Sequence, residues 1–297
     1  MKVFVTGATG VLGRAAVTAL QRDGHAVTGL ARTDEKAAEL AALGATASHV
    51  SLFDRAQLTA ALTGFDAVCH LATHIPVGIA GFRPGAWKLN DRLRIDGSKV
   101  VVQAARAAGV RRLVQESVSF LYADAGDEWI TEDSTLSVTR ALDPAAVAEA
   151  NAAEFACKSR QPVVLRFGNI VGDDAMTRWR LSQARAGRPI GLGDPQGWAH
   201  LVHPEDAGAA VSAALEAPGG VYNVGAEPVR REEMTQVFAR AAGHDALGFM
   251  PRILVRVGGD RLAALTRSHR VSSARLHETT GWKAVHHTFD ESWLSHG

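Results

Sequence analysis

The sequence predicts an α/β fold, in which a doubly wound parallel sheet is followed by a smaller, mostly helical C-terminal region. Short apolar runs rich in Val, Leu and Phe alternate with Ala-rich stretches of helical period, a pattern typical of parallel strands covered by helices on both faces. A glycine-rich turn directly follows the first apolar run. Past Val224 the alternation weakens, so we expect a smaller, mostly helical region in residues 225–297.

The apolar runs and the stretches between them give the expected elements in order. The runs predict strands at residues 2–5, 26–31, 46–51, 67–72, 113–117, 163–167 and 221–224. The stretches of helical period predict helices at residues 13–22, 34–43, 55–62, 97–108, 145–159 and 204–216. Two connections, 73–96 and 119–144, are longer than a crossover requires. Both follow the carboxyl ends of strands, where open parallel sheets bind their ligands.

Composition excludes several classes of protein. The chain has 297 residues, 46% of them apolar, so it can bury a sizeable core. With 32 Lys and Arg against 31 Asp and Glu, the net charge of +1 provides no field for binding nucleic acid or an anionic membrane. No signal peptide or membrane-length apolar run is evident, so we expect a cytoplasmic protein. Cys69 and Cys157 stand in no metal-ligand spacing and are expected to be reduced, buried thiols.

The glycine-rich turn predicts a dinucleotide site. Residues 6–13 read Thr-Gly-Ala-Thr-Gly-Val-Leu-Gly between a strand and a helix. Gly7 allows a tight turn, Gly10 lets the backbone approach a pyrophosphate, and Gly13 allows close packing of helix and strand. The helix N-terminus then holds the negative charge. We therefore expect a Rossmann-type domain in residues 1–175, completed by 203–224, with a substrate-covering region in 176–202 and 225–297.

Arg32 favours NADP(H) as the cofactor. It stands at the end of the second expected strand, where an NAD-selective protein would place a carboxylate on the adenosine ribose. A guanidinium there can pair with a 2′-phosphate, and Arg14 can assist. The alternative is a solvated Arg32 beside Asp34 and Glu35.

Several segments, in the correct order, resemble the extended branch of the short-chain dehydrogenase/reductase superfamily, which includes epimerases and dehydratases. The matching segments are residues 6–13, 52–54, 70–72, 97–98, 166–172, 202–206 and 222–225. Together with the glycine-rich turn and Arg32, the resemblance implies these cofactor contacts: Gly7, Thr9, Gly10, Val11, Leu12, Gly13, Arg14, Arg32, Phe53, Asp54, Leu71, Ala72, Thr73, Phe167, Asn169 and Ile170.

The catalytic residues of that family are missing. Its members use a Tyr as acid and base, a Lys four positions later and a Ser that polarises the carbonyl, yet no YxxxK occurs in this chain. With Glu154 taken as the acidic residue that relatives place four after the Lys, Ala146 and Ala150 fall where Tyr and Lys belong. Val118 falls at the Ser position. The polar groups left near the expected site are Ser117, Ser119 and Tyr122.

Two histidine pairs suggest a metal, but we expect none. His200 and His203 form an HxxH, and His286 and His287 are adjacent. The first pair lies in a landmark of the family, and no Cys or carboxylate cluster completes a set of ligands.

The region expected to cover the substrate is rich in arginines and aromatic residues. Arg178, Arg180, Arg185 and Arg188 could clamp a sugar-nucleotide diphosphate, although their spacing better suits the exposed face of an amphipathic helix. An apolar cleft suited to a flat polycyclic ligand is indicated by Phe82, Trp87, Phe120, Trp129, Met176 and Trp198.

These features favour an NADPH-dependent ketoreductase whose substrate supplies the proton. A ketone beside a phenolic hydroxyl carries an acid of its own, and the chain resembles ketoreductases that lack the triad and reduce angucyclinones, which are aromatic polyketides. A non-catalytic NADP(H)-sensing regulator is the alternative, and a sugar-nucleotide epimerase or dehydratase ranks third. We expect an aromatic ketone as the small-molecule partner and allow for a homodimer.

Overall fold

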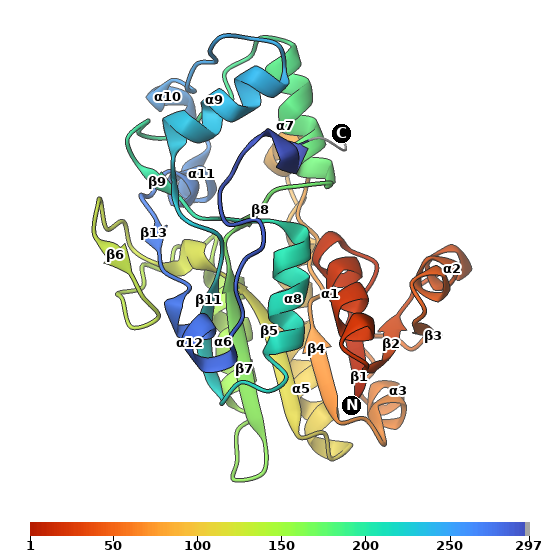
Figure 1. The fold of residues 1–297 in the computed structure, drawn as a ribbon. Coiled ribbons are helices and arrows are strands. Elements are labelled where there is room, and N and C mark those ends of the chain that lie inside the picture. The colour runs from red at the N-terminus through yellow and green to blue at the C-terminus, as the bar shows by residue number, and fades with distance from the viewer. Residues whose placement is uncertain (295–297) are drawn as a thin grey trace.

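A seven-stranded parallel sheet forms the centre of the protein (Figure 1). The computed structural model describes residues 1–294, apart from the side chains of residues 252, 254 and 261. The strand order is β11-β7-β5-β4-β1-β2-β3, so the direction of winding reverses between β1 and β4. The strands are β1 (Lys2–Thr6), β2 (Ala26–Leu30), β3 (Thr46–Ser48), β4 (Ala67–His70), β5 (Arg112–Val118), β7 (Gln161–Phe167) and β11 (Gly220–Val224). The predicted fold class and its seven strands are confirmed.

Helices cover both faces of the sheet, as a doubly wound fold requires. Val17 and Val211 lie in one apolar cluster, whereas Leu58 and Val101 lie in a second cluster on the other face. The helices of these two layers are α1 (Val11–Arg22), α2 (Asp34–Ala42), α3 (Arg55–Leu62), α5 (Ser98–Ala107), α6 (Asp143–Ala153) and α8 (Pro204–Ala213).

The helix predicted over residues 145–159 ends earlier, at Ala153. Cys157 and Arg160 exchange backbone hydrogen bonds in an antiparallel bridge, which turns the chain directly into β7. Helical propensity alone does not reveal this turn. Cys157 is consequently exposed, so the prediction of a buried thiol is wrong for Cys157, while Cys69 is buried as predicted.

A smaller region lies beyond the carboxyl ends of the strands and contains α7, α9, α10 and α11, at the top of Figure 1. Its helices are α7 (Ala175–Arg185), α9 (Arg231–Ala241), α10 (Arg252–Val257) and α11 (Gly259–Leu265). Three pairs of short strands connect it to the sheet: β8 (Asn169–Ile170) with β10 (Leu201–Val202), β9 (Trp198–Ala199) with β12 (Val229–Arg230), and β6 (Trp129–Ile130) with β13 (Arg270–Val271).

The last part of the chain departs from the predicted division at residue 225. α12 (Ala274–Thr280) returns to the sheet and packs against β11, and Leu276 and Trp282 belong to the core of the Rossmann-type domain. The remaining short helices are η1 (Gly78–Phe82), α4 (Lys88–Arg92), η2 (Leu93–Gly97), η3 (Ser119–Leu121) and η4 (Glu291–Leu294). None of the described helices has both the length and the apolar character of a membrane span.

The contact between α1 and α8 generates a prediction about stability. A Cβ added at Gly208 would lie 2.4 Å from the backbone C and O atoms of Ala15, so Gly208→Ala forces the two helices apart. We expect the free energy of unfolding to fall by about 1–3 kcal/mol despite the better helix propensity of Ala. Chemical denaturation measures this. Gly248→Ala is the matched control because its Cβ meets nothing closer than 3.8 Å, and equal stability of the two variants would contradict the prediction.

Candidate cofactor and substrate cleft

A cleft of about 1620 Å³ runs along the carboxyl ends of the central strands and up to α7 and α11. Most of the predicted cofactor contacts line it: Gly7, Thr9, Gly10, Val11, Leu12, Gly13, Arg32, Phe53, Leu71, Ala72, Thr73, Phe167, Asn169 and Ile170. Two predicted contacts lie outside. Arg14 donates a hydrogen bond to the carbonyl of Thr9 at 3.0 Å, and Asp54 caps α3 by accepting from the backbone N–H of Gln57 at 3.0 Å. Local capping explains Asp54 without a cofactor.

The glycine-rich turn fits a pyrophosphate. Gly7 has a φ of +71°, and a Cβ there would lie 2.6 Å from the Cα of Ala72. A Cβ at Gly13 would lie 2.0 Å from the carbonyl oxygen of Gly7. Helix α1 begins at Val11 with no acidic side chain in its first turn, so its free N–H groups face the cleft without a competing negative charge.

Arg32 stands at the other end of this nucleotide site. It lines the cleft just after β2, together with Lys36. Within the part of the chain that the structure describes, Arg32 forms no ion pair with Asp34 or Glu35, whereas Lys36 pairs with Glu39 at 2.6 Å. The arrangement leaves the Arg32 guanidinium available to a phosphate.

A buried ion pair corrects the predicted register of the catalytic helix. Arg166 of β7 donates to both carboxylate oxygens of Glu149, at 2.9 and 2.7 Å. Glu154 instead lies at the end of α6, where its backbone carbonyl accepts from Arg106. Glu149 is therefore the acidic residue of α6 that is held against the sheet, and we count the missing pair from it.

Counting back four and eight residues from Glu149 leads to Ala145 and Ala141. Both line the cleft, as does Val118 at the end of β5, whereas Ala146 and Ala150 do not. The predicted absence of Tyr and Lys stands, but the residues that occupy those places are Ala141 and Ala145. The wall facing the expected nicotinamide is thus apolar.

The polar groups predicted near the site lie beneath this wall and outside the cleft. Ser117 donates to Glu149 at 2.5 Å, and Ser119 bonds His200 at 3.0 Å. The Tyr122 hydroxyl donates to Asn223 at 2.8 Å and accepts from Arg166 at 3.0 Å. Burial raises the pKa of Tyr122. These three side chains stabilise the fold and do not reach the cleft, so their prediction as pocket groups is wrong.

A second buried ion pair lies in the cleft and was missed. Arg94 of η2 donates to Glu116 of β5 at 2.6 Å, and both side chains line the cleft although each is less than a tenth exposed. Burial raises the pKa of Glu116, and Arg94 opposes this shift. The Nε of Arg94 has no partner among the described residues. A charged residue inside the apolar run 112–118 was the signal that could have revealed the pair.

The substrate end of the cleft is apolar and aromatic, as predicted, although the residues that line it differ in part from those predicted. Phe82, Trp87, Phe120 and Met176 line it. Trp129 and Trp198 lie outside it, with the Arg270 guanidinium 4.3 and 4.8 Å from their ring centroids. The sequence missed these lining residues: Leu142, Trp179, Met250 and Leu262.

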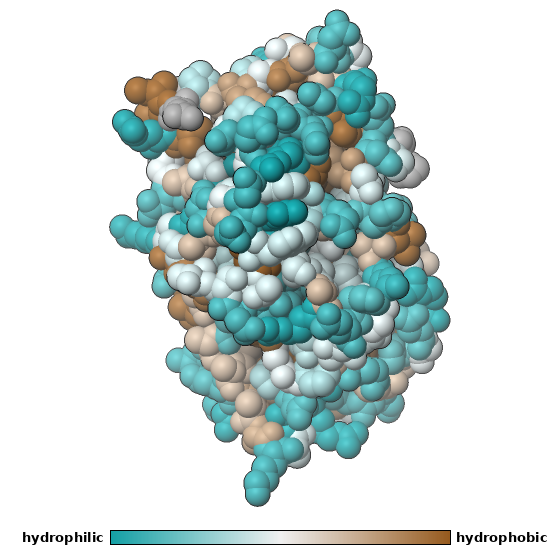
Figure 2. All heavy atoms as spheres, turned by 60° about the vertical axis from the view of Figure 1, so that its left-hand side comes forward, coloured by the Kyte–Doolittle hydropathy of each residue, from teal (hydrophilic) through white to brown (hydrophobic). Residues whose placement is uncertain are grey.

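Apolar side chains on the protein surface gather near this end of the cleft. Ile79 of η1 is 72% exposed and Val257 of α10 is 80% exposed. Figure 2 shows strongly apolar side chains at the upper left, at the end of the molecule that carries α7, α9 and α10 in Figure 1, on a face that is otherwise mostly hydrophilic.

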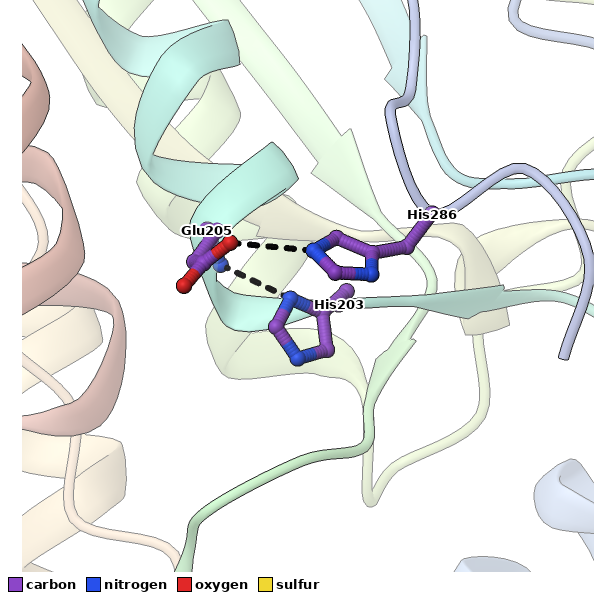
Figure 3. A group of neighbouring side chains, drawn as sticks. All are labelled: His203, Glu205 and His286. Carbon is purple, nitrogen blue, oxygen red and sulfur yellow. Dashed lines mark hydrogen bonds and ion pairs between the residues drawn. The ribbon is translucent and has the colours of Figure 1, made fainter. Parts of the chain in front are cut away.

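The histidines form a cluster that the sequence did not predict. His200 turns into the core toward Ser119, so the HxxH does not assemble. His203 instead lies against His286, with ring centroids 3.8 Å apart, and His286 bonds Glu205 at 2.9 Å (Figure 3). The potential ligand atoms of these three residues lie within 4.8 Å of one another. Trp293 makes edge-type contacts with both histidine rings. The cluster therefore packs the C-terminal segment against the start of α8.

Three other histidines generate a prediction about pH. Burial lowers the pKa of His70 to about 4, of His200 to about 3 and of His269 to about 4. The folded state keeps these rings neutral, while the unfolded chain protonates them below about pH 6.5. The free energy of unfolding should therefore fall as the pH drops from 6.5 toward 4, by up to about 1.4 kcal/mol per pH unit for each histidine.

Denaturation at several pH values measures this slope. His269→Asn removes the ring whose Nε2 lies 3.2 Å from the Tyr122 carbonyl, and should reduce the slope of stability against pH by the contribution of one histidine. His49→Asn changes an exposed ring and is the control. An unchanged slope in His269→Asn would contradict the assignment.

Comparisons with known proteins agree with this geometry. Residues 3–225 match the NAD dependent epimerase/dehydratase family. A 3-diazoavenalumate denitrifying reductase from a Streptomyces species is 32% identical, covering 96% of this chain and 97% of the relative. A 2-alkyl-3-oxoalkanoate reductase from Stenotrophomonas maltophilia is 28% identical, covering 82% of this chain and 76% of the relative.

Two solved structures share the fold. A human epimerase family protein with NADPH has a TM-score of 0.81 and 23% identity, covering 99% of this chain and 98% of that chain. A UDP-glucose-4-epimerase from Stenotrophomonas maltophila with bound NAD has a TM-score of 0.78 and 22% identity, covering 99% of this chain and 97% of that chain.

Proposed function

The chain belongs to the NAD-dependent epimerase/dehydratase family, and on this basis we propose that it is an NADPH-dependent reductase of an aromatic substrate. The bound cofactor supplies a hydride. The glycine-rich turn holds the pyrophosphate, and Arg32 contacts the 2′-phosphate. The apolar end of the cleft holds the aromatic body of the substrate.

The observation that carries the proposal is the apolar wall at Val118, Ala141 and Ala145. Reducing a ketone creates an alkoxide, and a positioned acid contributes about 10²–10⁴-fold to the rate of such a step. Among the described residues that line the cleft, Lys36 is the one lysine, and it lies at the Arg32 end. Other acids line the cleft, among them Glu116, which is held in the ion pair with Arg94. No Tyr or Lys stands at the apolar wall, so the proposed reaction takes its proton from the substrate or needs none.

A ketone beside a phenolic hydroxyl meets the first condition. Its internal hydrogen bond delivers the phenolic proton as the alkoxide forms, and water later reprotonates the phenolate. A flat polycyclic ketone of the angucyclinone kind would suit the aromatic cleft. The Streptomyces relative is named for a diazo substrate and not for an angucyclinone, so the angucyclinone remains part of the proposal and rests on the resemblance alone.

A diazo substrate meets the second condition and is the second candidate. When hydride attacks a carbon that bears a diazonium group, a C–H bond forms and the C–N bond breaks, and N₂ leaves with the electron pair of that bond. No proton enters the balance. The name of the Streptomyces relative favours this reaction for the present chain.

Two other functions fit the same fold less well. A regulatory protein that senses NADP(H) would bind the cofactor without oxidising it in the presence of any acceptor. A sugar-nucleotide epimerase or dehydratase would need an acid and a base at the wall that Val118, Ala141 and Ala145 form.

The cofactor assignment predicts the effect of Arg32→Ser. Losing the guanidinium should raise the dissociation constant for NADPH by about tenfold and leave that for NADH unchanged, because only NADPH carries the 2′-phosphate. Fluorescence titration with both cofactors measures this. Arg55→Ser, at an exposed arginine that does not line the cleft, is the control. An equal loss of affinity for both cofactors would argue against the assignment.

The source of the proton predicts which ketones react. An ortho-hydroxyaryl ketone should oxidise NADPH, and its methyl ether should not, although the ether still binds. Absorbance at the NADPH band measures turnover, and calorimetry with NADP⁺ measures binding of the ether. Undiminished turnover of the ether would refute proton supply by the substrate. Release of N₂ from an aryl diazonium acceptor, without turnover of either ketone, would establish the second candidate.

A further inference from the structure

Arg180 is set apart from the other arginines of α7 and its C-terminal flank. Arg178 pairs with Asp173 at the surface, and Arg188 donates to Gln183 at 2.7 Å. Arg185 is exposed to solvent. Arg180 alone of these four lines the cleft, so the predicted exposed face holds for three of them and not for Arg180.

Arg180 lies where the cleft meets a smaller pocket of about 50 Å³. Apart from Asn169, the side chains that line both cavities with it are apolar: Phe120, Ile190, Leu192 and Leu265. Asn169 belongs to the segment expected beside the nicotinamide, so Arg180 lies at the inner, reactive end of the cleft.

The Arg180 guanidinium has no partner in the described part of the chain, neither a hydrogen bond nor an ion pair. Arg180 is partly buried, whereas the fully buried arginines of the described chain all have partners: Arg94 pairs with Glu116, Arg166 pairs with Glu149, and Arg231 donates to the backbone carbonyls of residues 265–267. Burial lowers the pKa of Arg180, with Asp174 acting against the shift.

The carboxylate that acts on Arg180, that of Asp174, forms no ion pair with it. Both carboxylate oxygens of Asp174 are already engaged, by the N–H groups of Met176 and Thr177 and by the Thr177 hydroxyl. The other titratable groups of the smaller pocket are Arg231, His200 and His269, and no Asp or Glu is among its described lining residues. A guanidinium in such a place is costly without an anion, and a ligand can supply one.

We propose that Arg180 binds an anionic group of the substrate, either a carboxylate or a phenolate carried on an aromatic body. The inference rests on the proposed function for the identity of the cleft's occupant and extends it by naming the charge of that occupant. The planar fork of the guanidinium donates two parallel hydrogen bonds to a carboxylate, and the dry, apolar lining strengthens them. The anion is thereby held at the inner end while the aromatic body packs along Phe120.

Binding of matched probes to the full chain loaded with NADP⁺ tests the proposal without turnover. We expect calorimetry to show that 2-naphthoate binds at least tenfold more tightly than methyl 2-naphthoate, which has the same ring system and no charge. Arg180→Met should weaken 2-naphthoate binding by about 10- to 100-fold and leave the ester unaffected. Arg180→Lys should give an intermediate loss because it keeps the charge without the fork.

Controls separate this result from unfolding and from failure of the proposed function. Arg185→Met, on the same helix, should bind 2-naphthoate as the unmodified protein does, and unchanged NADP⁺ affinity in Arg180→Met shows that the fold is intact. The anion 4-nitro-1-naphtholate carries a phenolate-type oxygen and no carboxylate. Its binding to the same variants tests whether Arg180 binds a phenolate.

Equal binding of ester and acid, or undiminished binding of both anions to Arg180→Met, overturns the proposal. If a neutral aromatic acceptor oxidises NADPH while Arg180→Met binds 2-naphthoate as tightly as the unmodified protein does, the anion site is overturned and the reductase assignment stands. If probe binding depends on Arg180 but no acceptor oxidises NADPH, the anion site stands and the reductase assignment fails.

Discussion

The ion pair between Arg166 and Glu149 determines how the active-site helix faces the sheet. It joins β7 to α6 through two hydrogen bonds, and Ser117 of β5 donates to the same carboxylate. The pair is almost fully buried, so losing either partner would leave an isolated charge in the core, at a typical cost of about 3–5 kcal/mol. This constraint holds α6 in the rotation at which Ala145 faces the cleft, and Ala141 lines the cleft from the turn just before the helix.

Charge is distributed unevenly around that cleft. The buried charges are paired, Arg94 with Glu116 in the cleft and Arg166 with Glu149 beneath its wall. The hydroxyl groups of Ser117, Ser119 and Tyr122 bond Glu149, His200 and Asn223. The nucleotide end has Arg32 and the free N–H groups of α1, which suit phosphates. At the substrate end, Arg180 lines the cleft without a hydrogen bond or an ion pair to the described residues. In the proposed function, phosphates of the cofactor and an anion of the substrate would occupy these two ends, and the wall at Val118, Ala141 and Ala145 is apolar.

This separation of roles restricts the chemistry. A reductase with a protein acid can protonate many different alkoxides, whereas an apolar wall accepts only substrates that need no such help. A hydroxyketone with an internal hydrogen bond and a diazonium group that departs as N₂ are alike in this respect, although they differ in bonding. Selectivity would then come from the substrate's own reactivity and from its fit to an aromatic cleft, with the anion setting its orientation.

The sequence by itself determined the seven strands, the helices between them and the phosphate-binding turn, because apolar periodicity and glycine spacing are local properties of the backbone. It also showed that YxxxK is absent, since that is a matter of counting. It could not choose between Glu149 and Glu154, because both suit a helix and only contact with Arg166, on another strand, distinguishes them.

Tertiary structure likewise decided the direction of individual side chains. Ser117, Ser119 and Tyr122 turn into the core, His203 meets a histidine more than eighty residues away, and Arg180 faces inward from a helix whose other arginines face solvent. Spacing along the chain limits which residues can share a face. Which face meets the cleft depends on packing between distant segments, and the local pattern does not contain that information.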